Sequence, residues 1–582
     1  MSRFEIRKEG FFFDDKKITV LSGAMHYFRI LPDYWEDRLK KLKACGLNTV
    51  ETYIPWNLHE KSEGEFDFSG IADVERYISL AASYGLHVIL RPSPYICSEW
   101  DFGGLPAWLL ADRNINVRCS CPKYLEKVSK YYSVLIPRLA KYQCDNGGPV
   151  IMFQIENEYG SYGNDKSYLR FLKHLMTDLG VTVPMFTSDG GTFTHLNGGS
   201  LPDVFKVANF GGWPDEDLNC LKEFQPDMPL MCGEFWNGWF DHFGEAHHVR
   251  DLSDYEKCLD RLFDLGASVN IYMFHGGTSF GWMAGANHGG KYEPDVSSYD
   301  YDALLDEAGN ITEKYRITQK VIRKHFGDFP SEEFPKTPAC AYPDITFTSQ
   351  ASLFSCLDGI SEKRHTSSAL PMEMYGQNYG FILYKTTVPY YNEATLTIDS
   401  PHDRAHIFIN GKRQAIIYRN DAEKTVKVSF PEKENTLEIF VDTFGRVNFG
   451  HPLLDRKGLD CPVILNSFQE LFEWDVFCIE PQNLSSIPFE KSSENIDGPA
   501  FLRSVFEING DICDTYLRLD GFSRGQIWVN GFNLARYWIT AGPQKTFYIP
   551  SALLSRGKNE IILFETDCSE TLTAQFTDTP EI

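Results

Sequence analysis

The chain has 582 residues, 43% of them hydrophobic and 23% charged, and a formal net charge of −24 at pH 7. This composition is typical of a globular protein with large cores. The acidic charge argues against nucleic acid or an anionic membrane as a partner, because both require basic surfaces. No apolar run is long enough to form a membrane-spanning helix, so we expect neither partner.

The first 328 residues alternate short β-branched runs with longer amphipathic stretches. Residues 33–45, 71–84, 168–179 and 253–263 carry apolar side chains near the period of a helix. The runs expected as strands are residues 20–23, 49–53, 87–91, 150–154, 185–188, 205–209, 230–234 and 270–274. Eight strands alternating with helices predict a closed (β/α)8 TIM barrel, with an open doubly wound sheet as the alternative.

Beyond residue 328, a connector punctuated by prolines leads into short alternating strands, which predict all-β structure. This region contains a repeat in which residues 404–411 match residues 524–531 at an offset of 120. Each copy ends in Asn-Gly, which is typical of a type I′ hairpin turn. We therefore expect two β-sandwich domains, which either bind sugar or only buttress the barrel. The predicted divisions are a barrel at 1–328, a linker with a first all-β domain at 329–485, and a C-terminal β domain at 486–582.

Two segments place a carboxylate just past the end of a predicted strand. Residues 154–160 contain Glu158, and residues 232–236 contain Glu234. The carboxyl ends of barrel strands form the face where catalytic groups lie. Two carboxylates facing each other across a pocket are the machinery of glycoside hydrolysis, and in retaining enzymes they lie about 5–5.5 Å apart.

The first segment offers two carboxylates, Glu156 and Glu158. We choose Glu158 because the amide of the adjacent Asn157 can bond a sugar 2-hydroxyl. Polar and aromatic residues also follow the second, third and eighth predicted strands, and such groups suit a neutral sugar. Among them, Arg91 is expected to pair with a carboxylate and hold the site rather than touch the substrate.

Cysteines and histidines show no pattern that predicts a metal centre. The 14 cysteines include no Cys-x-x-Cys pair, and the 15 histidines lack metal-ligand spacing. His247-His248 is interpreted as a solvated loop pair, and we expect no metal and no cofactor. The amino terminus lacks the apolar segment of a secretory signal. Together with the unpaired cysteines, this predicts a cytoplasmic location, with unconventional surface export left open.

Several long motifs resemble glycoside hydrolase family thirty-five, the β-galactosidases. The motifs that carry the resemblance are Ser22–Arg29, Tyr53–Glu60, Arg91–Cys97, Gly103–Leu110, Gln154–Gly160, His275–Gly281 and Trp528–Trp538. The last of these resembles the final jelly-roll, galactose-binding-like domain of that family. The overall resemblance looks closest to short bacterial enzymes that cleave terminal β-1,3-linked galactose.

The resemblance implies a role for each matching position. Glu158 would be the general acid/base and Glu234 the nucleophile. The galactose would be held by Tyr53, Cys97, Ser98, Glu99, Asn157, Tyr272 and Tyr301.

The sequence departs from the animal lysosomal members at two of these places. Ser98 stands where they carry Ala, and Trp236 stands where they carry Tyr. We expect Trp236 and Trp239 to form an apolar wall for the leaving sugar, with Phe449 of the first β domain leaning over the same subsite.

These observations predict a retaining exo-β-galactosidase that removes terminal non-reducing β-D-galactose, β-1,3-linked, from oligosaccharides or glycans. One alternative is the same chemistry on another sugar, as in an exo-β-glucosaminidase or a β-glucosidase. Another is a carbohydrate-binding protein that has lost catalysis. A homodimer is compatible with the sequence.

Overall fold

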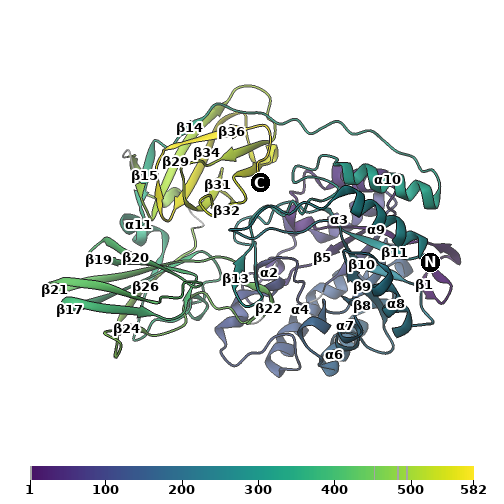
Figure 1. Cartoon of the computed structure of the whole chain (residues 1–582), viewed down its shortest axis with the longest axis horizontal. Coiled ribbons are helices and arrows are strands. Elements are labelled where there is room, and N and C mark those ends of the chain that lie inside the picture. Colours follow the sequence, from purple (N-terminus) through teal and green to yellow (C-terminus); the bar gives the residue numbers. More distant parts are fainter. Residues whose placement is uncertain (1–2, 93, 451, 482–483, 493–495) are drawn as a thin grey trace.

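The computed structural model describes residues 3–92, 94–450, 452–481, 484–492 and 496–582. Ser93, inside one of the motifs above, lies outside the described residues. Figure 1 shows a helix-rich barrel on one side and two β-rich bodies on the other. No helix within the described ranges is long and apolar enough to cross a membrane.

Eight parallel strands close into the predicted barrel, in the order β10-β11-β4-β5-β6-β7-β8-β9. The open doubly wound sheet is therefore wrong. Every residue of β5 and β7 is buried, as expected for a parallel sheet with both faces covered. The bounds are β4 (Leu21–Met25), β5 (Thr49–Tyr53), β6 (His87–Arg91), β7 (Val150–Gln154), β8 (Met185–Gly190), β9 (Phe205–Phe210), β10 (Met231–Trp236) and β11 (Ser268–His275).

The helices around the barrel bury one apolar stripe each. In α1 the buried side chains include Trp35, Leu39 and Leu42, at the spacing of an amphipathic helix. The longer helices are α1 (Trp35–Ala44), α3 (Val74–Ser83), α4 (Pro122–Ala140), α6 (Lys166–Asp178), α8 (Asp215–Phe224), α9 (Leu252–Asp264) and α10 (Glu313–Phe326). The shorter ones are α2 (Trp56–His59), α5 (Tyr159–Tyr162), α7 (Phe193–Gly199) and α11 (Leu353–Ile360).

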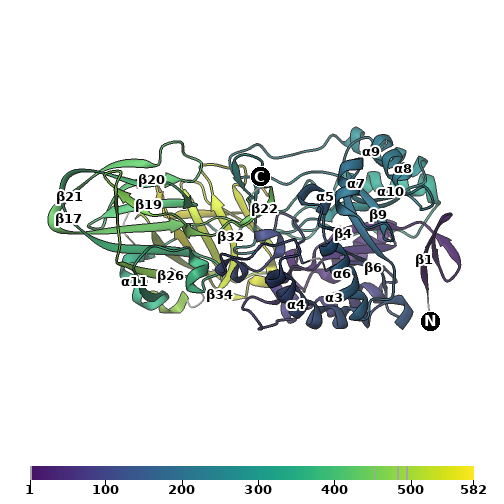
Figure 2. The same cartoon turned by 90° about the horizontal axis from the view of Figure 1, so that it is seen from below.

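A small antiparallel sheet precedes the barrel. It consists of β1 (Phe4–Arg7), β2 (Gly10–Phe13) and β3 (Lys16–Ile18). Phe11 meets Phe205 of the barrel edge-on, with ring centroids 5.6 Å apart. Figure 2 places this sheet at the end of the molecule opposite the β domains.

The first all-β domain is built on one large sheet, in the order β16-β26-β17-β21-β19-β20 with β24 and β25 attached. Its core includes Leu396, Ile407 and Ile439. The bounds are β16 (Glu362–Thr366), β17 (Phe381–Ile398), β19 (Arg404–Ile409), β20 (Lys412–Tyr418), β21 (Thr425–Asp442), β24 (Val463–Leu465), β25 (Gln469–Glu470) and β26 (Trp474–Ile479).

The second all-β domain is a sandwich of two sheets around a core that includes Leu502, Leu517 and Phe547. One sheet contains β27 (Glu490–Lys491), β15 (Ser349–Ser352), β29 (Ala500–Ile508), β34 (Gly557–Glu565), β31 (Arg524–Val529) and β32 (Phe532–Trp538). The other contains β14 (Ile345–Thr346), β36 (Thr573–Thr577), β30 (Thr515–Arg518) and β33 (Thr546–Ile549).

The sequence repeat corresponds to a repeated strand order. The order β17-β21-β19-β20 of the first domain matches β29-β34-β31-β32 of the second. Both Asn-Gly steps have positive φ at both residues, as a type I′ turn requires. Residues 345–352, placed by the predicted divisions with the first β domain, pair with strands of the second.

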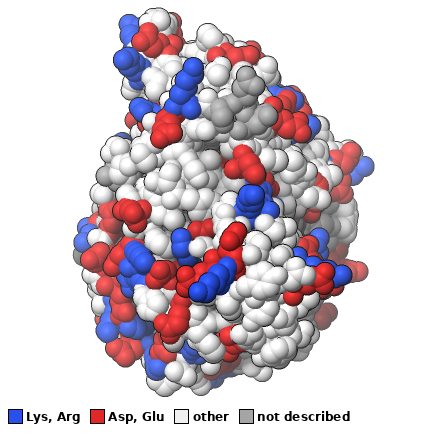
Figure 3. All heavy atoms as spheres, turned by 90° about the vertical axis from the view of Figure 1, so that its left-hand side faces the viewer, with Lys and Arg blue, Asp and Glu red and all other residues white. Residues whose placement is uncertain are grey.

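Strand pairing as well as the connecting chain joins the barrel to the β domains. The connector after α10 runs over one side of the molecule to β14 (Figure 1). The hairpin of β12 (Ala286–His288) and β13 (Tyr292–Pro294) extends from the barrel and pairs with β22 (Val447–Gly450) of the first β domain. Two short ladders, β18 (Pro401–His402) with β23 (Gly458–Leu459) and β28 (Ile496–Asp497) with β35 (Cys568–Ser569), complete the sheets. On the face of the β domains shown in Figure 3, acidic and basic side chains are interspersed.

Candidate active site

A cavity of about 240 Å³ opens at the carboxyl ends of the barrel strands. This volume lies just below the ~300–1,000 Å³ of typical ligand sites, which suits one small ligand. The cavity brings together every residue that the sequence predicted for the site: Tyr53, Cys97, Ser98, Glu99, Asn157, Glu158, Glu234, Trp236, Trp239, Tyr272, Tyr301 and Phe449. Sequence reasoning missed Ser161, Gly190, His195, Phe240 and Asn287, which also line it.

Glu234 lies on β10, where the strand register shifts after Cys232. The preceding residue, Gly233, has no room for a side chain, since an added Cβ would lie 2.6 Å from Ser188 Oγ. The carboxylate of Glu234 accepts hydrogen bonds from Tyr53 Oη at 2.7 Å and Arg91 Nη2 at 2.6 Å. The expectation that Arg91 pairs with a carboxylate is confirmed. These donors fix the orientation of the carboxylate in the cavity.

The indole of Trp236 makes a contact that the sequence did not predict. Its Nε1–H donates to Glu234 Oε2 at 3.1 Å. We expected this side chain to be only part of an apolar wall. In the structure it also supplies the second carboxylate oxygen of Glu234 with a donor.

Glu158 follows the end of β7 and has a left-handed φ of 44°, as Glu156 does at 56°. Its Oε1 accepts a hydrogen bond from Asn209 Nδ2 at 3.0 Å. Burial is the main influence that raises the pKa of Glu158 to about 8, and the negative charge of Glu234 adds to it. A carboxyl with this pKa keeps its proton at neutral pH and can act as an acid.

Glu156, in contrast, does not line the cavity. It is fully buried and forms an ion pair with Arg118 at 2.9 Å. Tyr168 Oη also donates to it at 3.1 Å. Of the two carboxylates in the first segment, Glu158 lines the cavity and Glu156 anchors the loop beneath it.

Asn157 links the two halves of the site. Its Oδ1 accepts from Arg91 Nη2 at 2.8 Å and lies 2.9 Å from Tyr53 Oη, whose single hydrogen is directed to Glu234 at the shorter distance. Its Nδ2 donates to the carbonyl of Ile96 at 3.3 Å. Because an amide nitrogen carries two hydrogens, the second remains able to meet a ligand in the cavity.

The opposite wall is a turn of three successive left-handed residues, Cys97, Ser98 and Glu99, with φ between 46° and 59°. In an extended strand their side chains would alternate between faces, whereas here all three line the cavity. Arg29 Nη1 donates to Ser98 Oγ at 2.8 Å and holds the turn. Burial raises the pKa of Glu99 to about 7, although Tyr299 donates a hydrogen bond to its carboxylate.

Tyr272 and Tyr301 form the aromatic end of the cavity. Their rings meet edge-on with centroids 5.5 Å apart. Tyr272 Oη lies 3.1 Å from Tyr299 Oη, so this end is linked by hydrogen bonds to Glu99 through Tyr299.

An aromatic rim surrounds the entrance. Trp239 is 37% exposed and Phe449 is 40% exposed. The rings of Trp236 and Trp239 meet edge-on at 5.5 Å, and Trp239 stacks on Phe240 at 4.9 Å. Phe449 comes from the first β domain, on β22, so two domains build the rim.

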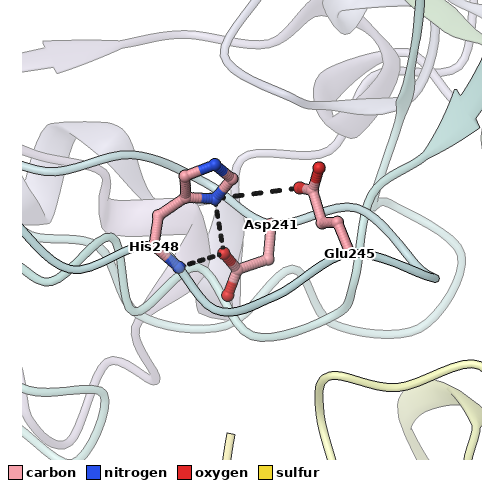
Figure 4. Close-up of side chains that lie close together, drawn as sticks. All are labelled: Asp241, Glu245 and His248. Atoms are coloured by element: carbon pink, nitrogen blue, oxygen red, sulfur yellow. Dashed lines mark hydrogen bonds and ion pairs between the residues drawn. The ribbon is translucent and has the colours of Figure 1, made fainter.

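The loop after β10 holds a separate cluster of titratable side chains, Asp241, Glu245 and His248, shown in Figure 4. Their potential ligand atoms lie within 4.8 Å of one another, and the set has the composition of a cation site. His248 donates to Asp241 through both Nδ1 and the backbone N–H, each at 2.9 Å. His247 Nδ1 donates to the other oxygen of Asp241 at 2.7 Å. His247 and His248 lie in a loop with side chains 25% and 41% exposed, as a solvated pair would, and both imidazoles also bind the buried carboxylate of Asp241.

The fold and the site together define a class of protein. A barrel with two carboxylates in one small cavity, one of them held by three donors and the other with a raised pKa, is the arrangement of a glycoside hydrolase.

Comparison with known proteins identifies the family. The family model described as "Glycosyl hydrolases family 35" matches residues 10–325. The models "Beta-galactosidase, first all-beta domain" and "Beta-galactosidase, galactose-binding domain" match residues 369–480 and 499–559. The chain belongs to glycosyl hydrolases family 35.

Similar proteins cover nearly the whole chain. "Beta-galactosidase" of Mus musculus is 39% identical over 100% of this chain and 95% of its own. "Beta-galactosidase-1-like protein 2" of Homo sapiens is 38% identical over 98% and 91%. "Beta-galactosidase" of Xanthomonas manihotis is 39% identical over 92% and 89%. These animal and bacterial relatives are about equally similar to the chain.

Proposed function

We propose that this glycoside hydrolase is a retaining exo-β-galactosidase that removes terminal non-reducing β-D-galactose, β-1,3-linked, from oligosaccharides or glycans. The observation that carries the proposal is the pairing of Glu158 and Glu234 in one cavity with contrasting surroundings. The names of the full-length relatives support galactose as the sugar.

In the proposed mechanism, Glu234 attacks the anomeric carbon while Glu158 protonates the glycosidic oxygen. The leaving sugar departs and a galactosyl-enzyme forms on Glu234. Glu158 then removes a proton from water, which attacks the anomeric carbon and releases galactose. The raised pKa of Glu158 supports its role as the acid in the first step. In the covalent intermediate Glu234 carries no charge, so the pKa of Glu158 falls and Glu158 becomes able to act as the base in the second step.

The remaining roles follow from position in the cavity. Tyr53, Asn157, Tyr272, Tyr301 and the turn 97–99 would hold the galactose. A cavity of about 240 Å³ favours exo action, since it suits one sugar unit. The exposed rings of Trp239 and Phe449 would contact the leaving sugar. The β-1,3 preference rests on the resemblance to the bacterial enzymes.

The first test is proton NMR of the purified enzyme acting on an aryl β-D-galactoside. Release of β-galactose before mutarotation is the expected result. If α-galactose appeared first, the enzyme would be inverting and the assignment of Glu234 as nucleophile would be wrong. Aryl β-glucoside and β-glucosaminide tested alongside should be poorer substrates; a preference for either would overturn the choice of galactose.

Two variants separate the roles of the carboxylates. Glu158→Ala and Glu234→Ala should both lose turnover, while Glu126→Gln, an exposed control on α4, should not. Azide should restore activity to Glu158→Ala alone, on substrates with good leaving groups, and should give β-galactosyl azide. Rescue of Glu234→Ala with retained configuration would reverse the assignment.

We also propose a cytoplasmic location and a homodimer. All 14 cysteines are unpaired, which favours a reducing compartment. Fractionation of the source cells tests the location, and light scattering of the purified enzyme tests the oligomeric state.

A further inference from the structure

A second cavity, of about 220 Å³, lies where the barrel meets both β domains. We call it the junction cavity. Its walls come from the loop after β10, the β12–β13 hairpin, the end of β20 and the end of β32. Figures 1 and 2 show β22 and β32 at this boundary, between the barrel and the β domains. Its volume is close to that of the catalytic cavity, so it can accommodate a ligand of similar size.

Aromatic rings form much of the junction cavity. Phe243, Tyr418 and Trp538 line it, one from each of the three domains. The centroid of the Trp538 ring lies 5.9 Å from those of both Phe243 and Tyr418. Tyr418 and Trp538 are only half-buried. Such rings offer apolar faces to the C–H groups of a pyranose, together with a phenol and an indole N–H at their edges.

Polar groups suited to hydroxyls lie among these rings. Glu245, Lys291, Glu293 and Asn420 all line the cavity. The side chains of Lys291 and Glu293 make no hydrogen bond or ion pair with the described part of the chain. The two carboxylates outnumber the lysine, so the site disfavours an anionic ligand. Aromatic faces with a few polar groups and no excess positive charge favour a neutral sugar.

Two of these polar groups, Asn420 and Glu245, are held in place by contacts with neighbouring residues. Asn420 Nδ2 donates to the carbonyl of Tyr292 at 2.7 Å, which ties the first β domain to the hairpin. Glu245 Oε1 lies 3.0 Å from His242 Nδ1. The cluster in Figure 4 anchors the same loop, since His248 bonds Asp241 at one point and approaches Glu245 at 3.8 Å at another.

The junction cavity and the catalytic cavity share two walls. In the loop after β10, Trp239 and Phe240 line the catalytic cavity, and His242 and Glu245 line the junction cavity. In the hairpin, Asn287 faces the catalytic cavity while the residues from 291 to 294 face the other. A ligand in one cavity therefore contacts the same segments that shape the other.

We propose that the junction cavity is a second saccharide-binding site, which takes one neutral pyranose unit without hydrolysing it. It lacks a pair of carboxylates at barrel strand ends, so it binds sugar but does not perform the chemistry of the catalytic cavity. The choice of galactose as the first probe rests on the proposed function, whereas the proposal that the junction cavity binds a sugar does not depend on it.

Fluorine NMR of the wild-type enzyme labelled with 5-fluorotryptophan tests the proposal. The chain has 11 tryptophans, of which Trp538 reports on the junction cavity and Trp236 and Trp239 report on the catalytic cavity. Each resonance is assigned with its Trp→Phe variant. D-Galactose, D-glucose and N-acetyl-D-glucosamine are then titrated separately.

The expected result is a saturable shift of the Trp538 resonance with at least one of these sugars, at a half-saturating concentration different from that of Trp236. Tyr418→Ala should raise the half-saturating concentration at Trp538 by about tenfold, as expected for loss of one contacting ring. It should leave the Trp236 titration and hydrolysis unchanged. Tyr390→Ala, a control at an exposed position on β17, should change neither.

Two outcomes would overturn the proposal. One is a Trp538 resonance that none of the three sugars moves. The other is a Trp538 shift that follows Trp236 at every concentration and survives Tyr418→Ala, because it would then be transmitted from the catalytic cavity. If Tyr418→Ala failed to fold, Lys291→Ala combined with Glu293→Ala on the hairpin would make the same test. If the proposed function were wrong, galactose would leave the Trp236 resonance unmoved, whatever happened to the Trp538 resonance.

Discussion

Replacing Asn209 with alanine should raise the pKa of Glu158 further. The Asn209 amide donates to Glu158 Oε1 at 3.0 Å and so favours the ionised carboxylate. Ser188 Oγ donates to Asn209 Oδ1 at 2.6 Å and fixes the orientation of that amide. Burial and the charge of Glu234 already hold the pKa of Glu158 at about 8. Without the amide, burial and the charge of Glu234 still raise the pKa of Glu158, and the hydrogen bond that lowered it is lost.

The size of the shift follows from the hydrogen bond. A bond to a charged group contributes about 1.5–3 kcal/mol, and one pKa unit corresponds to about 1.4 kcal/mol. Because Glu158 faces a cavity that solvent can enter, we take the lower end and expect a rise of about one unit. Glu158 must be protonated to act as an acid, so activity falls as the pH rises through its pKa.

The assay is the pH dependence of kcat/KM on an aryl β-D-galactoside whose leaving group needs protonation, because its basic limb reports the acid of the free enzyme. In Asn209→Ala this limb should move to higher pH, while the maximum falls. Ser188→Ala keeps the amide and should move it less. A basic limb that stays in place or moves to lower pH in Asn209→Ala would refute this account of Glu158.

Three further changes test other contacts. Trp236→Phe removes the donor to Glu234 Oε2 and should lower kcat/KM by about tenfold to a hundredfold without changing the melting temperature; an equal loss of stability would contradict a role in positioning. Arg118→Met removes the cation that pairs with the buried carboxylate of Glu156 and should cost about 3–5 kcal/mol in the free energy of unfolding, measured with urea; a loss below about 1 kcal/mol would mean that this ion pair contributes little to stability. Burial raises the pKa of Asp241, but the hydrogen bonds from His247 and His248 outweigh this effect and lower the pKa below its usual value. The hydrogen bond to Asp241 raises the pKa of His247. Their contribution should therefore be fullest between about pH 4 and pH 6.5 and fade as the pH rises through the raised pKa of His247. Asp241→Asn should remove this pH dependence from urea unfolding, and an unchanged profile would contradict it.

The barrel could be predicted from sequence because its strands are buried on both faces. Residues 49–53, 87–91 and 150–154 have the bounds expected from apolar runs alone. The other five strands extend one or two residues beyond an expected end, and β4 and β10 also begin one residue later than expected. At β10 the extension includes Phe235 and Trp236, which follow a register shift, and the position of such a shift depends on contacts between strands rather than on the run itself.

Most predicted members of the site lie just after a strand end or inside a motif of the family. Two of the missed residues, His195 and Asn287, do neither. His195 lies on α7, and Asn287 lies on a hairpin strand opposite Phe449, which is 162 residues further along the chain. Tertiary pairing of this kind leaves no local pattern. The bond from Trp236 to Glu234 was missed for another reason, since it depends on which way an indole turns.

The first β domain lines the candidate active site and does more than support the barrel. Phe449 lines the cavity, and the carbonyl of its neighbour Asn448 accepts a hydrogen bond from Tyr95, just before the turn at 97–99. Arg446, on the same segment, is buried and pairs with Asp101 at 3.2 Å, just after that turn. Both ends of the strained turn are therefore held by the β domain. Because left-handed residues persist only where surrounding contacts hold them, the shape of the proposed galactose wall depends on a domain that contributes no catalytic carboxylate.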